Sequence, residues 1–450
     1  MAPEESVEVE DSAGDEGPKP ALIFAHLKLP FLLLLLCFIA WGAAQDLTNS
    51  LVSVFTTVFA ISSVQAALIQ TAYFGAYFSL AIPAAYINKR FGYKTGVVAG
   101  LGIAAVGGVL FLPATSLLSY PLILVAYFVL ASGLSMLETS ANPFVIAMGP
   151  VKSATQRLNL AQAFNPVGTN IGVLLSLVLI LPALVIKDDD TRKKLSGSTL
   201  HDSQVHDMGV VVRPYLGIAA VLVIVGVLIF LRKMSTPAEE KQQEREEKGE
   251  ASSKGVLSRL YRNRLYRYGV VAQFFNVGAQ VCTWSFTIQY GQDILGMSKT
   301  HAGFYLQAGA IVFLLSRFLM TYLLGIFRPT KLLLAMASLG VLLGAFAAIS
   351  QSEAGLIAVV MISLSLSLMF PTIYGVALKG LGDDTKFGAA GLVMAILGGA
   401  LLPVVHGAVA DATNQATAYV VPAICMAVVA AYALFELRTS RHVPEVAAAH

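Results

Sequence analysis

The sequence predicts an all-α membrane protein with twelve transmembrane helices in two pseudo-symmetric six-helix bundles. Of its 450 residues, 56% are hydrophobic and 13% are charged, and the mean hydropathy is +0.72. A soluble domain carries roughly 25% charged residues. The charges here are confined to short windows between apolar stretches of about 20 residues or more, and each stretch is long enough to cross a hydrocarbon core of ~30 Å as a helix.

The predicted spans follow one another through most of the chain. They cover residues 28–59, 64–88, 94–114, 121–149, 155–185, 212–232, 264–292, 300–326, 330–350, 354–379, 386–410 and 416–437. Residues 1–27 begin with MAPEESVEVEDSAGDEGPKP. This acidic segment is the reverse of a basic signal-peptide start, and it predicts a disordered cytoplasmic tail. Residues 438–450 are expected to form a second cytoplasmic tail.

A polar segment at residues 233–263 divides the spans into two sets of six. Its first part, STPAEEKQQEREEKGEASSKG, is typical of a flexible linker. Its continuation, VLSRLYRNRLYRYG, predicts a helix at the cytoplasmic interface. The flanking regions, 28–232 and 264–437, repeat one another, with WGAAQ in span 1 and NVGAQ in span 7. Two related bundles around a central substrate site are what alternating access requires.

The distribution of basic residues predicts the orientation. With the N-terminus inside, most of the 30 Lys and Arg fall on the cytoplasmic side, so the positive-inside rule places both termini in the cytoplasm. The opposite side holds Lys187, Arg192, Lys193, Lys194, Arg213 and Lys299. Most of these lie in a polar segment, 187–212, which is interpreted as a solvated loop. Its two histidines, with flanking Asp, offer a metal site as the weaker alternative.

Several classes of function are not indicated. The three cysteines all lie in apolar stretches without a motif, so neither a disulfide framework nor a metal site is predicted. No cofactor, enzymatic activity or nucleic-acid binding is expected, and the lysines and arginines are attributed to topology. The chain is expected to be a monomer in a plasma membrane or a bacterial inner membrane.

One buried acid points to function. Glu138 lies in the segment LETSANPF at 137–144, inside an apolar stretch that runs from Leu122 to Met148. A charge at that depth costs at least ~2.5–3.5 kcal/mol, and intramembrane acids are functional by default. The alternative is a structural carboxyl that is hydrogen-bonded to a neighbouring helix.

Together with this segment, three further motifs carry a family resemblance: RLNLAQAFNPVG at 157–168, QFFNVGAQVCTWSF at 273–286 and FPTIYGVALKGLGDDTKFG at 370–388. The chain resembles the major facilitator superfamily over nearly all of residues 28–437. Within it, the chain is similar to the fucose–proton symporter family and its glucose/galactose relatives, and it looks closest to the fucose branch.

The resemblance implies a secondary transporter that moves a monosaccharide, L-fucose or a related hexose, together with a proton. It implies that Glu138 and an acid of span 1, here Asp46, titrate during transport. The family pattern in span 1 resembles Asn-x-x-Asp, whereas this chain has Asp46-Leu47-Thr48-Asn49. The acid therefore keeps its helix face but moves about 4.5 Å toward the cytoplasm at ~1.5 Å per residue.

A sugar presents hydroxyls and apolar C–H faces, so its site needs amides, carboxyls and an aromatic ring. Residues of this kind are Gln45 and Asn49 in span 1, Asn142 in span 4, Gln162 and Asn165 in span 5, and Asn276, Gln280 and Trp284 in span 7. For each amide, interhelical hydrogen bonding is the alternative, and for Trp284 it is an interfacial belt. Arg317 in span 8 is interpreted as fastening the cytoplasmic helix ends, and alternatively as a partner for an acid.

Two other functions remain open. An uncoupled or Na⁺-coupled sugar facilitator of the same fold is supported by the exchanged Asp46 and Asn49. A membrane sensor or enzyme on a transporter fold would need a large soluble domain, and every soluble segment of this chain is shorter than about 35 residues.

Overall fold

The computed structural model describes residues 21–59, 63–186, 189–234, 236–237 and 255–440. The side chains at residues 46–57 and at a few positions near breaks in these ranges lie outside the description. The first half contains α1 (Lys28–Phe59), α2 (Ser63–Ser116), α3 (Tyr120–Ala147), α4 (Ala154–Ala163), α5 (Asn165–Leu175), α6 (Asp189–Lys194) and α7 (Gly197–Phe230).

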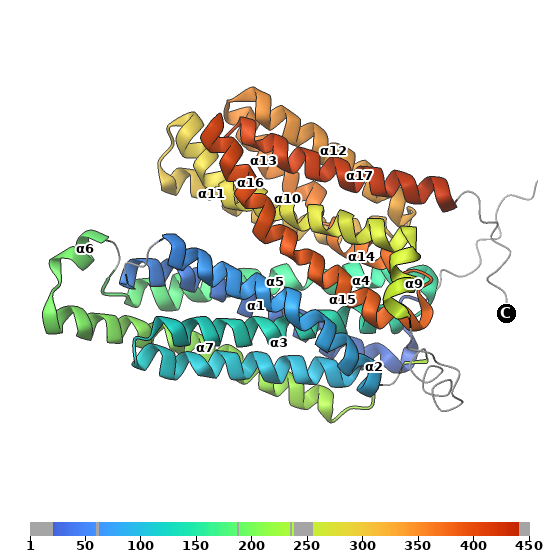
Figure 1. Ribbon diagram of the computed structural model, residues 1–450, viewed down its shortest axis with the longest axis horizontal. Helices are drawn as coiled ribbons and strands as arrows, with labels where there is room; N and C mark the ends of the chain where they lie inside the picture. The colour runs from blue at the N-terminus through green and yellow to red at the C-terminus, as the bar shows by residue number, and fades with distance from the viewer. Residues whose placement is uncertain (1–20, 60–62, 187–188, 235, 238–254, 441–450) are drawn as a thin grey trace, which may run out of the picture.

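Among the described residues, the second half contains eight helices of its own and one short helix that leads into it. They are α9 (Val256–Arg262), α10 (Arg264–Leu295), α11 (Lys299–Leu323), α12 (Pro329–Ser350), α13 (Glu353–Leu366), α14 (Met369–Ala377), α15 (Thr385–Met394), α16 (Gly398–Ala412) and α17 (Val420–Ser440). Short 3₁₀ or π turns flank several of them. Figure 1 shows the two halves as separate groups of roughly parallel helices that meet at one end.

Within the described residues, ten helical stretches are long and apolar enough to cross a membrane. One of these, Leu68–Ser116, contains two predicted spans, because Gly92 adopts φ 81° and ψ 165° between them. Only glycine reaches that backbone conformation at little cost. The predicted seventh span, α10, is not among the ten, because its amides and arginines make it more polar. The helical stretches therefore account for all twelve predicted spans.

Three predicted spans are interrupted. The fifth breaks at Phe164 between α4 and α5, the tenth breaks at residues 367–368 between α13 and α14, and a 3₁₀ turn at Ala395–Leu397 separates α15 from α16. Prolines explain the first two breaks, because Pro166 and Pro371 lie just after them and have no backbone N–H. Broken helices at membrane depth are tolerated where the protein covers them.

The predicted solvated loop at 187–212 is wrong in its second part. There α7 begins at Gly197, so the helix extends well beyond the predicted start of the sixth span. Asp207 is fully buried and accepts hydrogen bonds from the backbone N–H groups of Val185 and Ile186 at 2.8 Å each. Gln204 donates to the Val58 carbonyl at 2.9 Å. These contacts hold the polar part of the helix against the ends of neighbouring segments.

The predicted interfacial helix after the linker forms only in part. It ends at Arg262, and Asn263 then caps α10 by accepting a hydrogen bond from the Tyr266 amide at 3.1 Å. The second half of the predicted helix therefore belongs to the seventh span.

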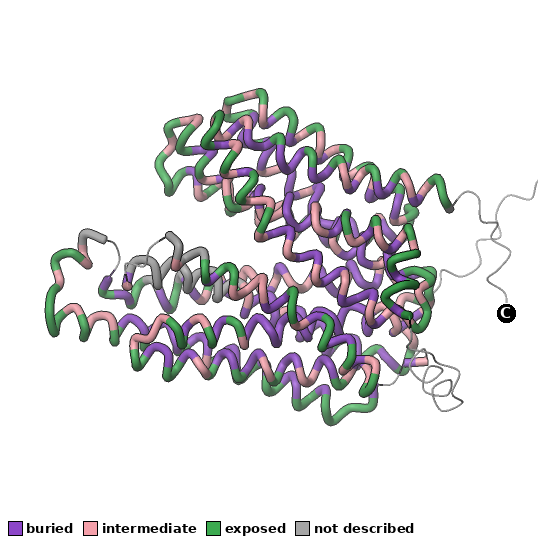
Figure 2. The backbone as a smooth tube through the Cα atoms, viewed as in Figure 1, coloured by how far each residue is buried: buried purple, intermediate pink, exposed green. Residues whose placement is uncertain are grey.

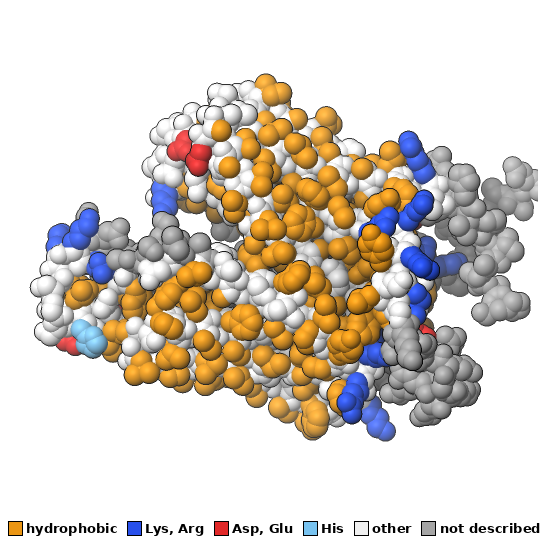
Figure 3. All heavy atoms as spheres, viewed as in Figure 1, with side chains coloured by type: hydrophobic (Ala, Val, Ile, Leu, Met, Phe, Trp, Pro, Cys, Tyr) orange, Lys and Arg blue, Asp and Glu red, His pale blue; other side chains and the backbone are white. Residues whose placement is uncertain are grey.

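Contacts between the two halves concentrate at the end of the molecule where α9 lies, called here the α9 end. Tyr86 of α2 packs edge-on against Phe387 of α15, with ring centroids 5.0 Å apart. Gln156 of α4 donates to the Thr321 carbonyl of α11 at 3.2 Å. Toward α6 the two groups diverge, and Figure 3 shows a notch between them. The structure is closed at the α9 end and open at the α6 end.

Close contact between α1 and α5 depends on two glycines. A Cβ at Gly168 would collide with the Ile39 carbonyl oxygen, and a Cβ at Gly42 would collide with that of Asn165. Neither backbone can move away without opening the helix pair. We expect Gly168→Val to lower the stability by about 1–3 kcal/mol, measured as a lower thermal unfolding temperature in detergent. The control is Gly102→Ala, where the added Cβ meets nothing within 4 Å. Equal stability of the two variants would contradict this packing.

Candidate substrate and proton site

Helix α3 runs through the middle of the first half. Every residue from Leu130 to Val145 is buried, as the purple stretch of α3 in Figure 2 shows. Gly133 and Gly100 make this possible, because a side chain on either one would collide with the backbone of the facing helix. Glu138 lies at the centre of this stretch and is 2% exposed. The predicted intramembrane acid is therefore fully enclosed.

Pro143 shapes α3 one turn after Glu138. Because it has no N–H, the Thr139 carbonyl loses its usual helical partner. Asn88 of α2 replaces that partner by donating to Thr139 O at 3.3 Å, and the Ser140 hydroxyl donates back to Asn88 Oδ1 at 2.8 Å. The proline therefore ties the centre of α3 to α2, one turn before the break at Gly92.

A proline also leaves a backbone carbonyl without its helical partner in the fifth span. Pro166 cannot donate to the Gln162 carbonyl, so this acceptor is free at the end of α4. Arg317 of α11 occupies it, with Nη1 2.6 Å from Gln162 O. The Gln162 side chain donates to Asn142 Oδ1 of α3 at 2.8 Å. Arg317 of one half is thereby hydrogen-bonded to Gln162 of the other half, which in turn is bonded to Asn142.

Arg317 also lies within electrostatic reach of Glu138. It is 6% exposed, its guanidinium lies over the Phe313 ring at 4.7 Å, and it interacts electrostatically with Glu138. Among the described residues, its Nε has no hydrogen-bond partner. Tyr73, Tyr77 and Tyr374 also lie within electrostatic reach of Glu138. Three tyrosines and one arginine therefore interact electrostatically with the acid.

Helix α10 supplies a polar face from the second half. Asn276, Gln280 and Trp284 recur at four-residue intervals and so share one side of the helix. Asn276 is completely buried, and neither of its amide atoms has a partner within the described residues. Trp284 donates from Nε1 to Ser363 Oγ at 3.3 Å and packs edge-on against Phe313, with centroids 4.9 Å apart. Gln280 is partly buried.

The predicted residues of the first span are only partly described. Gln45 is partly buried in α1, and the side chains of Asp46 and Asn49 lie outside the described residues. Asn165 is partly buried at the start of α5, and its Nδ2 has no partner in the described part. The structure thus joins Asn142, Gln162 and Arg317 by hydrogen bonds and places Glu138 within electrostatic reach of Arg317. It joins Trp284 to these residues through Phe313. Within the described part of the chain, no hydrogen bond links them to Asn276, Gln280, Gln45 or Asn165.

Unsatisfied polar groups mark where a polar ligand fits. In native proteins most buried polar atoms are paired. Among the described residues, partners are lacking for Asn165 Nδ2, both amide atoms of Asn276 and Arg317 Nε. The Tyr374 hydroxyl lies next to Asn142. These groups come from both halves of the chain and offer donors as well as acceptors.

The sequence interpretation ranked Tyr374 only as a weaker candidate for the sugar site, and it gave Arg317 the role of a partner for an acid only as an alternative. The signal for Arg317 was present: an arginine in an apolar helix is itself a functional indication, and Pro166 marks the free carbonyl four residues before it. Arg317 joins α11 to α4 and also lies within electrostatic reach of the acid.

The chain matches the model of the Major Facilitator Superfamily over residues 31–396. It is 39% identical to the "L-fucose-proton symporter" of Escherichia coli (strain K12) over 415 residues, 92% of this chain and 94% of the relative. The "Glucose/galactose transporter" of Brucella abortus is 34% identical, over 89% of this chain and 92% of the relative.

Solved structures agree. The crystal structure of the transporter FucP in the outward conformation has a TM-score of 0.84 at 38% identity and covers 91% of this chain and 98% of its own. The proton:xylose symporter XylE, at 13% identity and a TM-score of 0.64, shares the fold. The twelve helices, the two halves that meet at one end and these matches together establish that this integral membrane protein belongs to the major facilitator superfamily.

Proposed function

We propose that this protein is a proton-coupled symporter of a monosaccharide, with L-fucose as the first candidate, and that Glu138 carries the proton. The observation that carries the proposal is the enclosed Glu138, which lies within electrostatic reach of Arg317, while hydrogen bonds join Arg317 to Gln162 and Asn142 of the other half. The relatives named for fucose–proton symport support the choice of fucose. The glucose/galactose relatives make other hexoses the second choice.

The sugar site uses amides from both halves of the chain. Asn142 and Gln162 face it from the first half, and Asn276, Gln280 and Trp284 face it from the second, with Gln45, Asn49 and Asn165 at its α1/α5 side. Each amide can donate and accept, as a sugar hydroxyl requires. Trp284 offers an apolar ring face for the C–H groups of the sugar, held in place by its bond to Ser363.

Proton coupling follows from the charge of Glu138. When the acid is ionised, it attracts the Arg317 guanidinium, and when it is protonated that attraction is lost. Because Arg317 also holds the Gln162 carbonyl, the proton changes a contact between the two halves. A protonated carboxyl can in addition donate to a sugar oxygen. Sugar and proton therefore favour the same switch, and Asp46 in span 1 is the second titrating acid.

The α9 end is assigned to the cytoplasm. Lys and Arg side chains gather there, as Figure 3 shows, in accord with the positive-inside rule. Arg259 of α9 binds both carboxylate oxygens of Asp384, at 2.7 and 2.6 Å, and these hydrogen bonds raise the pKa of Arg259. The bundles comprise residues 28–232 and 264–437, the linker 233–263, and the tails 1–27 and 438–450. The transporter acts as a monomer in the cell membrane, with both termini inside.

The test is uptake of radiolabelled L-fucose into proteoliposomes with an inward proton gradient, with and without a protonophore. Accumulation that collapses with the protonophore supports proton symport. Accumulation that follows an imposed Na⁺ gradient, or equilibration unaffected by either gradient, supports the alternative facilitator to which the exchanged Asp46 and Asn49 point. Absence of fucose transport, with transport of glucose or galactose in the same vesicles, would overturn the choice of sugar only.

Asn276 gives a direct check of the sugar site. Asn276→Ala removes a buried, unpaired amide, and the loss of a hydrogen bond to the sugar is worth about 0.5–1.5 kcal/mol. We expect the apparent KM for fucose to rise up to about tenfold, with the thermal unfolding temperature unchanged or higher. Gln289→Ala, on the exposed side of the same helix, is the control. An unchanged KM in Asn276→Ala would remove Asn276 from the site.

A further inference from the structure

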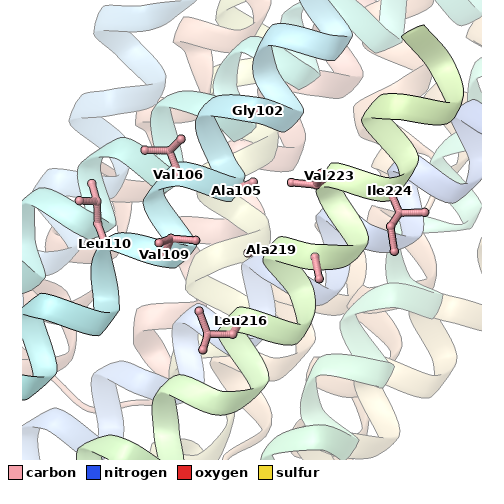
Figure 4. A pocket seen from close by; sticks show the side chains of 10 residues that line it. Gly102, Ala105, Val106, Val109, Leu110, Leu216, Ala219, Val223 and Ile224 are labelled. Atoms are coloured by element: carbon pink, nitrogen blue, oxygen red, sulfur yellow. The ribbon is translucent and has the colours of Figure 1, made fainter. Parts of the chain in front are cut away.

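An apolar groove lies on the outer surface of the first half, away from the substrate site. It has a volume of about 590 Å³ and is lined by α2 and α7: Gly102, Ala105, Val106, Val109, Leu110, Leu216, Ala219, Ala220, Val223 and Ile224. Figure 4 shows the two helices with their side chains facing across the gap. Small residues create it, since a Cβ at Gly102 would meet nothing within 4 Å. Its rim is open, with Val106 56% and Val223 50% exposed.

Basic residues lie at the α9 end of the same helix pair. Lys94 of α2 donates to the Phe230 carbonyl at the end of α7, at 2.9 Å, and its ammonium lies 5.7 Å from the Phe230 ring. Arg232 and Lys233 follow directly and are exposed. No Asp or Glu occurs in residues 86–102 or 216–234. Within the described residues, no ion pair joins an Asp or Glu to this basic cluster, Lys94, Arg232 and Lys233, which lies at the ends of both groove walls.

The spacing joins the two features. Lys94 precedes Gly102 by eight residues, and Arg232 follows Ile224 by eight, which is about 12 Å along a helix. Both groove walls are membrane-spanning, so the groove lies at hydrocarbon depth and the cluster near the polar interface. An apolar slot that ends in a cationic site matches a molecule with an acyl chain and an anionic headgroup.

We propose that an anionic phospholipid binds here, with an acyl chain in the α2/α7 groove and its phosphate at Lys94, Arg232 and Lys233. The Lys94 ammonium keeps protons free beyond its bond to Phe230. The lipid fills the space between the two helices and so stabilises the first half. This site is independent of the sugar and proton site.

The experiment uses the purified, delipidated full chain in detergent. Phosphatidylglycerol and phosphatidylcholine with identical acyl chains are titrated separately, retained lipid is counted by native mass spectrometry, and the thermal unfolding temperature is recorded. Ala220→Phe and Gly102→Leu fill the groove from opposite walls. The double variant Arg232→Gln with Lys233→Gln removes charge from the cluster. The control for the groove variants is Val404→Phe, at an exposed position of α16. The control for the charge variant is Lys331→Gln with Lys379→Gln, two exposed lysines outside the cluster.

We expect the parent and both controls to retain phosphatidylglycerol preferentially and to unfold at a higher temperature with it. The groove variants should lose both effects, and the charge variant should bind the two lipids equally. Equal retention of both lipids by the parent would overturn the headgroup assignment. Undiminished retention of phosphatidylglycerol in Ala220→Phe and Gly102→Leu would show that the acyl chain does not lie in the groove. That conclusion would hold even if the basic cluster bound the lipid phosphate by itself.

Discussion

Glu138→Gln is expected to abolish proton-driven accumulation of the sugar while sugar exchange across the membrane continues. Glutamine has the shape of the protonated acid and remains neutral, so the loaded form persists and the carrier can still cycle with sugar bound. It cannot release a proton, so net uptake no longer follows the proton gradient. An ionised carboxylate at this depth costs at least ~2.5–3.5 kcal/mol, and a neutral replacement in a site that is 2% exposed should not unfold the protein.

The measurement compares two assays in the same proteoliposomes: uptake driven by an inward proton gradient, and counterflow of labelled sugar without any gradient. We expect uptake in Glu138→Gln to fall to the level of empty vesicles and counterflow to stay within a few-fold of the parent. Glu353→Gln, an exposed acid that accepts a hydrogen bond from Tyr305 at 2.6 Å, is the control and should behave as the parent. Gradient-driven accumulation in Glu138→Gln would show that the acid is structural.

The membrane location, the number of spans and most of their limits follow from hydropathy alone, because the bilayer imposes the length of each apolar segment. The first predicted span, 28–59, coincides with α1. The sequence did not predict the helix from Gly197, because its polar residues resemble a loop until Asp207 and Gln204 are seen to bond with neighbouring backbone. Tertiary hydrogen bonds of that kind leave no periodic signal.

The site was predictable to a similar degree. Glu138, Asn142 and Gln162 were predicted because polar groups are costly in an apolar helix, and Asn142 and Gln162 prove to be bonded to each other. The sequence could not show which half of the chain supplies their partners. Residue spacing tells which face of a helix a side chain lies on, but it does not tell which helix packs against that face. The contact between Arg317 and the Gln162 carbonyl depends on Pro166 and on the packing of α11 against α4. The role of Pro166 can be inferred from the sequence, whereas the helix packing is known only from the structure.

Arg317→Gln is expected to reduce gradient-driven uptake at least about tenfold, because a hydrogen bond from a charged donor is worth about 1.5–3 kcal/mol and this one joins the two halves of the chain. Arg317→Lys should recover little, since an ammonium lacks the planar fork that reaches the Gln162 carbonyl over Phe313. Arg328→Gln is the control. Arg328 pairs with Glu436 at 3.1 Å within the second half, where a partly exposed ion pair contributes about 0–1 kcal/mol.

Counterflow in the double variant, Glu138→Gln with Arg317→Gln, distinguishes two ways in which Arg317 can act. If the arginine acts through the charge of Glu138, its removal costs less once that charge is already gone, and the two effects on counterflow are not additive. If it acts only through the hydrogen bond that joins α11 to the Gln162 carbonyl, the two effects add. Non-additivity is the expected result, because the guanidinium interacts with the acid and the carbonyl at once. Uptake at the parent rate in Arg317→Gln alone would contradict both.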